Sequence, residues 1–173
     1  MADIEKTLDL SKRVSIRNTT NIDTFFRYAL KGADAKVAKK SRLSISTEEL
    51  MAQIDNANPD FVGHNRDGRH ATFYIESKDL RVYFGFETED GKVKQEVIDE
   101  QAIIDMFDAA NLAIFVSQLK DKIITTGEKQ TLRDVIASNK VNAHDKIALA
   151  TAYLRGEAIE APKNKGGRKP KAT

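Results

Sequence analysis

The chain has 173 residues, with 28 Lys and Arg against 26 Asp and Glu and no cysteine. This length suits one domain with a core large enough for stability. The lack of cysteine excludes a disulfide framework, a thiolate nucleophile and a cysteine-based zinc site, and it is typical of the reducing cytosol. The most apolar stretch, residues 109–116, is too short to span a bilayer, and the charged start has no hydrophobic signal core. We therefore expect a cytoplasmic protein with no membrane partner.

Charge is segregated along the chain. Residues 1–45 hold ten Lys and Arg against five Asp and Glu, a net charge of +5, and residues 163–173 hold five bases and no acid. Residues 46–162 hold thirteen bases and twenty-one acids, a net charge of −8. The sequence predicts a basic arm with one short helix over 1–45, a single α+β domain over 46–158 and a basic tail over 159–173. Variation among solvated faces is the alternative explanation for the charge of the arm.

The first 45 residues show little periodicity. Val14 and Ile16 alternate weakly among polar neighbours, which predicts an extended arm with one short strand. Asn21 or Asp23 is suited to cap a helix that contains the aromatic residues near position 25 and ends at Gly32.

The next segment predicts a helix followed by a sheet. Ser46 and Glu49 have the spacing of a capping box, and Pro59 stops the helix that they open. Residues 61–98 then show a period of two, with turn signals between four apolar runs. This pattern predicts a four-stranded antiparallel meander (about 61–98) that buries Ala71, Phe73, Ile75, Leu80, Val82, Phe84 and Phe86.

Helical spacing follows the meander. Asp99 is a plausible cap for apolar residues that recur with helical period over 103–123, and this segment is expected to pack across the sheet. Two more helices are predicted, one over 131–138 and one over 143–155, before Gly156. The fold class is therefore α+β, a meander packed against helices, with an extended basic N-terminal arm and a disordered-type basic C-terminal tail.

No motif for catalysis, a metal or a cofactor is present. The chain has neither a phosphate-binding glycine loop nor a nucleophile elbow. His64 and His70 flank a turn at Asp67, where solvated polar residues are ordinary, and we predict no catalytic residue, no metal and no cofactor. An acid-lined pocket beside either histidine would favour an enzyme.

Two segments are candidates for nucleic-acid contact within the body. Residues 81–86 are similar to the aromatic strand of RNA-recognition sheets, although a valine follows Arg81 and the glycine stands one place late. This resemblance implies that Arg81 and Tyr83 contact bases, whereas a cross-strand pair of Tyr74 and Tyr83 explains the same pattern without a ligand. Residues 131–155 have the outline of a helix-turn-helix, which also fits a closely packed, alanine-rich helical hairpin.

The tail is the third candidate. Residues 167–170, Gly-Arg-Lys-Pro, resemble the AT-hook, which lies in the minor groove of A·T-rich DNA. The core of that motif is Arg-Gly-Arg-Pro, and with glycine at position 166 and lysine at position 169 its paired arginines are incomplete. A solubilising terminus is the alternative. If the tail does contact nucleic acid, the binding is weak and salt-sensitive and involves Lys163, Lys165, Arg168, Lys169 and Lys171.

These patterns favour a non-enzymatic structural or interaction protein of a larger nucleoprotein assembly. Its basic ends would contact nucleic acid or acidic protein surfaces, and its body would contact protein subunits, including copies of itself. Small cysteine-free chains with such arms and tails look like virion accessory proteins of tailed bacteriophages. The alternative is a free DNA- or RNA-binding regulator that uses the sheet face or the C-terminal helical hairpin.

Overall fold

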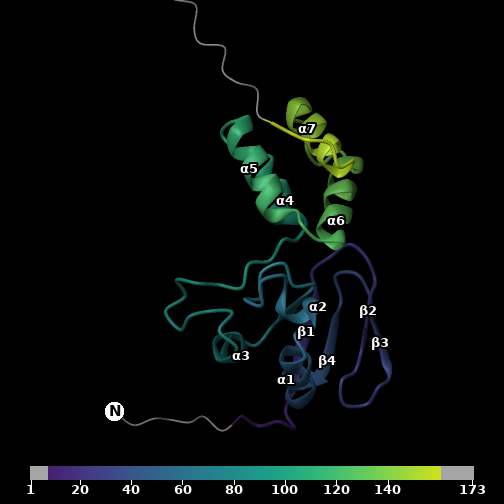
Figure 1. The fold of residues 1–173 in the computed structure, drawn as a ribbon, viewed down its shortest axis with the longest axis vertical. Coiled ribbons are helices and arrows are strands. Elements are labelled where there is room, and N and C mark those ends of the chain that lie inside the picture. Colours follow the sequence, from purple (N-terminus) through teal and green to yellow (C-terminus); the bar gives the residue numbers. More distant parts are fainter. Residues whose placement is uncertain (1–7, 161–173) are drawn as a thin grey trace, which may run out of the picture.

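The computed structural model describes residues 8–160, which form seven helices and two small antiparallel sheets (Figure 1). The strands are β1 (Arg13–Asn18), β2 (Thr24–Arg27), β3 (Asp34–Val37), β4 (Arg42–Ser46) and β5 (Phe73–Ile75). The helices are α1 (Thr47–Asp55), α2 (Pro59–Val62), α3 (Lys78–Tyr83), α4 (Glu100–Met106), α5 (Leu112–Lys122), α6 (Thr126–Ala137) and α7 (His144–Leu154). The predicted mixture of helices and sheet is confirmed, but the meander is not present.

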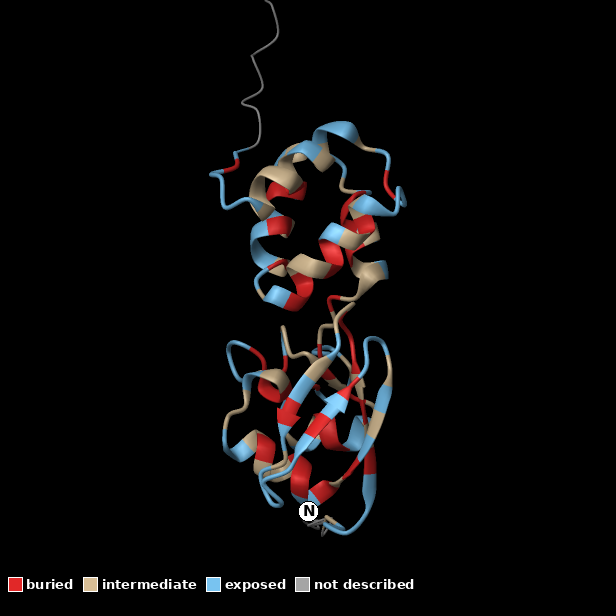
Figure 2. Ribbon diagram, turned by 90° about the vertical axis from the view of Figure 1, so that its right-hand side faces the viewer, coloured by how far each residue is buried: buried red, intermediate tan, exposed pale blue. Residues whose placement is uncertain are grey.

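Two hydrophobic cores divide the described chain into a strand lobe (residues 8–97) and a helical lobe (residues 98–160), placed end to end in Figure 2. The first core lies between Val14 and Phe86 in sequence, and the second between Ile98 and Ile159. The helices after residue 99 therefore pack mainly on one another, and the prediction that they cover the sheet is wrong. None of the helices in residues 8–160 is both long and apolar enough to cross a membrane.

The segment predicted as an extended arm supplies the central strand of the three-stranded sheet, whose order is β4-β1-β5. Strand β1 pairs antiparallel with β4, from Arg13 opposite Ser46 to Arg17 opposite Arg42. It pairs with β5 over only three residues, Ile16–Asn18. The alternation at Val14 and Ile16 was the sign of a buried strand face, and both partner strands are distant in sequence.

The helix predicted near position 25 is also wrong, because β2 and β3 form a separate hairpin there. Strand alternation buries Phe26, whose ring centroid lies 5.2 Å from those of Tyr28 and Phe61, and leaves Phe25 63% exposed.

The capping prediction for α1 is confirmed, since the Ser46 hydroxyl accepts a hydrogen bond from the Glu49 N–H at 3.2 Å. The Glu49 carboxylate has a different role from the one that a capping box gives it. It accepts hydrogen bonds from the N–H groups of Ala29 and Leu30, at 2.7 and 3.1 Å. Helix α1 thereby fixes the turn of the β2–β3 hairpin.

Of the four strands predicted over 61–98, only β5 forms. The third apolar run is helix α3, capped by the Ser77 hydroxyl, which accepts a hydrogen bond from the Leu80 N–H at 3.4 Å. Leu80 and Phe84 are four residues apart, so the run that alternates also fits the helical period. The Ser77 cap favours the helix over the strand.

The helical lobe begins as predicted, because the Asp99 carboxylate accepts a hydrogen bond from the Ala102 N–H at the start of α4. The expected continuous helix is interrupted, and α5 starts anew with Asn111 as its cap. Helix α6 starts at Thr126 rather than at Thr131, because Thr125 and Glu128 form a complete capping box.

Candidate nucleic-acid interface

The outer face of the three-stranded sheet carries a row of cationic side chains. Residues alternate across a strand, so burial of Val14 and Ile16 directs Arg13 and Arg17 to the opposite face. On the neighbouring strand β4, Arg42 lies directly opposite Arg17. The register of two strands therefore places three arginines on one surface.

A single carboxylate lies between two of these arginines. Oε1 of Glu76 is 2.9 Å from Nε of Arg17 and 3.1 Å from Nε of Arg42. The Glu76 side chain is 29% exposed and that of Arg42 is 66% exposed, so the pair is accessible to an external anion. One negative charge is shared by two positive charges, and one positive charge remains in excess.

The same arrangement recurs where the sheet meets the helical lobe. Glu100, at the start of α4, accepts hydrogen bonds from Lys140 and Lys40, and these two contacts lower the pKa of Glu100 from 4.5 to about 2. A crevice of about 390 Å³ lies here, and Arg17 also lines it. Asp99 lines the crevice too, but its carboxylate is the cap of α4.

Arg13 completes the surface. Its Nε donates to the Ser44 hydroxyl at 3.0 Å, and its guanidinium also donates to the Ser44 carbonyl oxygen. No carboxylate in residues 8–160 pairs with it. We use the name basic strand face for the five cations Arg13, Arg17, Lys40, Arg42 and Lys140.

The tyrosine of β5 lies beside this face. The guanidinium carbon of Arg17 is 5.2 Å from the ring centroid of Tyr74, and that of Arg81 is 4.7 Å from it. Arg81 is otherwise engaged inside the protein: its Nε donates to Glu87 at 2.7 Å and one Nη donates to the Ile75 carbonyl at 2.6 Å. The two guanidiniums fix the orientation of the tyrosine ring.

The structure separates the residues that the sequence analysis grouped for nucleic-acid contact. The Arg81 side chain is 9% exposed and internally paired, whereas Tyr83 is 56% exposed and its ring lies 5.2 Å from that of Phe84. Tyr74 is therefore stacked with arginine and not with Tyr83. The predicted tail contacts, Lys163, Lys165, Arg168, Lys169 and Lys171, lie outside the described residues.

The helical hairpin of α6 and α7 forms, but most of its polar side chains make contacts within the protein. Lys146 donates to the carbonyl oxygen of Ala109 at 2.7 Å and to that of Phe107. Arg155 pairs with Glu157 at 2.9 Å. Of these two cations, Lys146 is held by backbone carbonyls of the protein, whereas the Arg155 side chain remains 64% exposed.

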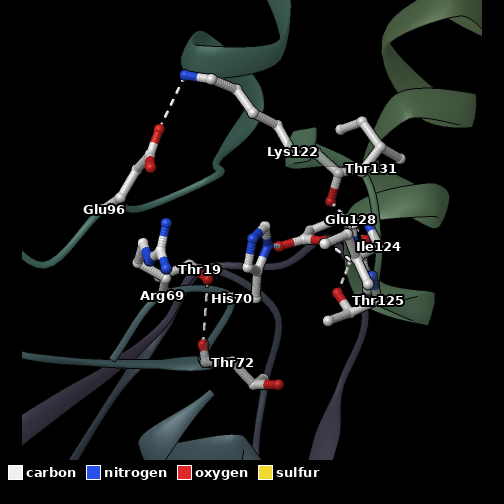
Figure 3. Close-up of polar contacts among 12 residues, drawn as sticks. Thr19, Arg69, His70, Thr72, Glu96, Lys122, Ile124, Thr125, Glu128 and Thr131 are labelled. Atoms are coloured by element: carbon white, nitrogen blue, oxygen red, sulfur yellow. Dashed lines mark hydrogen bonds and ion pairs between the residues drawn. The ribbon is translucent and has the colours of Figure 1, made fainter. Parts of the chain in front are cut away.

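The two lobes meet at a polar junction, shown in Figure 3. Nδ1 of His70 lies 2.7 Å from Oε1 of Glu128, and the two side chains are 10% and 5% exposed. A hollow of about 280 Å³ beside them is lined by His64, Asp60 and threonine hydroxyls. The two histidines thus line one hollow, but no three His, Asp or Glu side chains in residues 8–160 are placed to hold a metal ion.

Sequence analysis missed the groups that build these sites. Glu76, Glu100 and Lys140 belong to no motif. Only the fold brings Glu76 to Arg17 and Arg42, and Glu100 to Lys40 and Lys140. The Thr125 and Glu128 capping box was visible in the sequence and would have placed the start of α6 correctly.

Comparison with known proteins gives no relative for this chain. No protein-family model, curated protein or solved structure matches it.

Proposed function

We propose that this protein is a non-enzymatic interaction protein of a nucleoprotein assembly and that its basic strand face holds the phosphate backbone of nucleic acid. One observation carries the proposal: Glu76 and Glu100 each serve two cations, and Arg13 has no carboxylate partner among the described residues. The surface therefore retains positive charge after all of its own ion pairs have formed. A polyanion is the partner that such a surface attracts.

The geometry suits phosphate contact rather than base reading. A strand rises about 3.3 Å per residue, so Arg13 and Arg17 are about 13 Å apart along one strand. Arg42 stands beside Arg17 on the next strand, and guanidinium groups donate to phosphate oxygens in a bidentate manner. Contacts of this type position a protein on nucleic acid without selecting a sequence.

The tail adds to this surface in the proposal. Residues 163–173 carry five further positive charges. Two weak sites on one chain raise the effective local concentration of the ligand, and several copies in an assembly multiply the effect. This arrangement suits a virion accessory protein, in which many copies meet one nucleic acid.

The test is fluorescence anisotropy with short labelled DNA of mixed sequence, single-stranded and duplex, at low salt. The double variant Arg17→Ala/Arg42→Ala should bind about tenfold more weakly than the native protein, because two phosphate contacts are lost. Arg155→Ala is a control for the loss of one positive charge, since it removes an exposed arginine with a carboxylate partner from a remote helix end. Equal binding by the double variant and the native protein would overturn the proposal.

The same experiment distinguishes the proposed phosphate-binding protein from a free regulator that reads bases. A phosphate-binding surface gives one affinity for DNA of different sequences and loses it steeply between about 50 and 200 mM salt. A regulator that reads bases keeps a preference for one sequence at moderate salt. Sequence preference that survives in the double variant would favour the regulator.

A further inference from the structure

Strand β1 has an incomplete partner on one of its edges. Strand β5 pairs with it over Ile16–Asn18, and one more hydrogen bond follows, from the Glu76 N–H to the Ser15 carbonyl oxygen at 3.0 Å. The chain then turns away at Ser77, which caps α3. Within residues 8–160, no strand neighbours the first residues of β1 on this side.

The hydrogen-bond pattern shows which backbone groups face that edge. On the β4 side, the Asn18 N–H donates to Ser41 and the Lys12 carbonyl accepts from Thr47. Even-numbered residues of β1 therefore point their peptide groups toward β4, and odd-numbered ones toward β5. The N–H and carbonyl of Arg13 point to the open edge, and no backbone group in residues 8–160 pairs with them there.

A groove of about 430 Å³ lies against this edge. Its apolar lining consists of Leu8, Val14, Leu80 and Tyr83, and Tyr83 is 56% exposed. An open strand edge beside an apolar groove is the arrangement by which proteins bind extended peptides through strand addition.

We propose that this edge and groove bind an extended segment of a protein partner, which adds as a strand beside β1. In such a strand, the side chain next to Val14 would enter the apolar groove. The side chain next to Arg13 would lie on the outer face, where the guanidinium has only the hydroxyl and carbonyl of Ser44 as partners among the described residues. A carboxylate is complementary there.

Charge complementarity therefore defines the partner as a segment in which apolar and acidic residues alternate. Lys12, Asp9 and Asp79 also line the groove, and the charge of Lys12 acts on the Asp9 carboxyl. The nearby Asp9 is occupied by Ser11, whose hydroxyl and N–H donate to it at 2.7 and 3.0 Å. These hydrogen bonds from Ser11, with a smaller contribution from the charge of Lys12, lower the pKa of Asp9. The ionised Asp9 offsets the charge of Lys12, so the acidic preference of the groove is assigned to Arg13 on the outer face.

The probe is a labelled peptide of alternating valine and glutamate, measured by fluorescence polarisation against the full-length protein. Peptides with lysine or serine in place of glutamate are its matched controls. The glutamate peptide should bind about tenfold more tightly than the lysine peptide, because like charges facing each other oppose binding. Equal affinities for the two peptides would overturn the acidic assignment.

The decisive variant is Arg13→Pro, compared with Arg13→Ala. Proline removes the N–H that faces the open edge and is tolerated on strand edges, since that N–H makes no bond to β4. Arg13→Ala removes the side chain but keeps the N–H. Binding of the serine peptide should fall about tenfold further in the proline variant than in the alanine variant, from loss of the backbone bond. Equal binding in both variants contradicts strand addition.

A second measurement keeps the proposal testable if the proline variant unfolds. The native protein is given a glutamate peptide that is N-methylated at alternate residues, in both possible registers. One register should lose binding and the other should keep it, because only one edge of an added strand bonds to β1. Loss in neither register overturns the proposal. The proposal would also be overturned if the native protein were a dimer that Arg13→Pro dissociates, because a second copy of the chain would then occupy the edge.

Discussion

Glu128 joins the two lobes to each other through His70. One carboxylate oxygen lies 2.7 Å from Nδ1 of His70, and the other accepts hydrogen bonds from the N–H groups of Ile124 and Thr125, both at 2.8 Å (Figure 3). The same side chain therefore caps α6 and holds the strand lobe against it. Removing a nearly buried carboxylate with three hydrogen-bond partners should lower the free energy of unfolding substantially.

Replacement of Glu128 by alanine should lower the free energy of unfolding by roughly 2–4 kcal/mol, because a cap and a charged hydrogen bond disappear together. Urea unfolding followed by circular dichroism measures the loss. Glu157→Ala is the control: that carboxylate is exposed and pairs with Arg155, so the loss there should stay within about 0.5 kcal/mol. Similar losses in the two variants would show that the junction adds little stability.

Gly127 and Thr20 are in close contact across the junction. A Cβ added at Gly127 would lie 2.6 Å from Cγ2 of the buried Thr20. Glycine to alanine in a helix ordinarily stabilises by about 1 kcal/mol, but here the clash should make Gly127→Ala destabilising.

Thr20→Ser removes the clashing methyl group and retains the hydroxyl, which donates to Asn18 at 2.8 Å. Combined with Gly127→Ala, it should recover most of the loss, giving a coupling energy of about 1 kcal/mol or more in a double-mutant cycle of urea unfolding. Additive effects of the two substitutions would contradict this packing.

The pKa of Glu100 leads to a pH-dependent contribution to stability. Hydrogen bonds from Lys140 and Lys40 lower this pKa from 4.5 to about 2. A carboxyl group with a depressed pKa in the folded state stabilises that state above its ordinary pKa and ceases to do so as the pH falls toward the depressed value. The stabilisation is therefore full near neutral pH and lost between about 4.5 and 2.

The difference in urea midpoint between the native protein and Glu100→Gln isolates this effect from the other carboxyl groups. It should be present at neutral pH, shrink as the pH falls through the acid range and decrease in high salt, because the ion pairs are partly exposed. A difference that is the same at neutral and acid pH would contradict the assignment of the two lysines to Glu100.

Glu76 competes with nucleic acid for two arginines. Glu76→Gln removes the shared negative charge while preserving the size of the side chain, so Arg17 and Arg42 become available to phosphates. DNA affinity should rise several-fold in anisotropy titrations at low salt. Glu157→Gln changes the net charge equally at a remote site. If DNA affinity rises equally in both variants, the cause is the change in net charge and not the release of the arginines on the sheet face.

Local signals predicted several element starts. Ser46 and Asp99 act as caps where the sequence places them, because a cap is a contact between residues three positions apart. Segments whose structure depends on distant partners were mispredicted. Val14 and Ile16 gave a weak alternation, yet β1 became the central strand because residues 42–46 and 73–75 pair with it.

The candidate site was less predictable than the fold, for the same reason. Its cations come from three separate parts of the chain, and the two carboxylates that pair with them are distant from them in sequence. Arg81 was a candidate because of its aromatic neighbours, but Glu87 and the Ile75 carbonyl hold it inside the protein. Net charge per segment identified the first 45 residues as cationic, without indicating which of these cations would remain unneutralised.

Whether the basic strand face binds phosphates is best measured from the salt dependence of DNA binding by the protein without residues 162–173. We expect this shortened protein still to bind duplex DNA, and we expect Arg17→Ala/Arg42→Ala to lower the slope of log affinity against log salt by about 1.8, or about 0.9 per lost phosphate contact. Absence of binding, or an unchanged slope in the double variant, would contradict phosphate binding by this face.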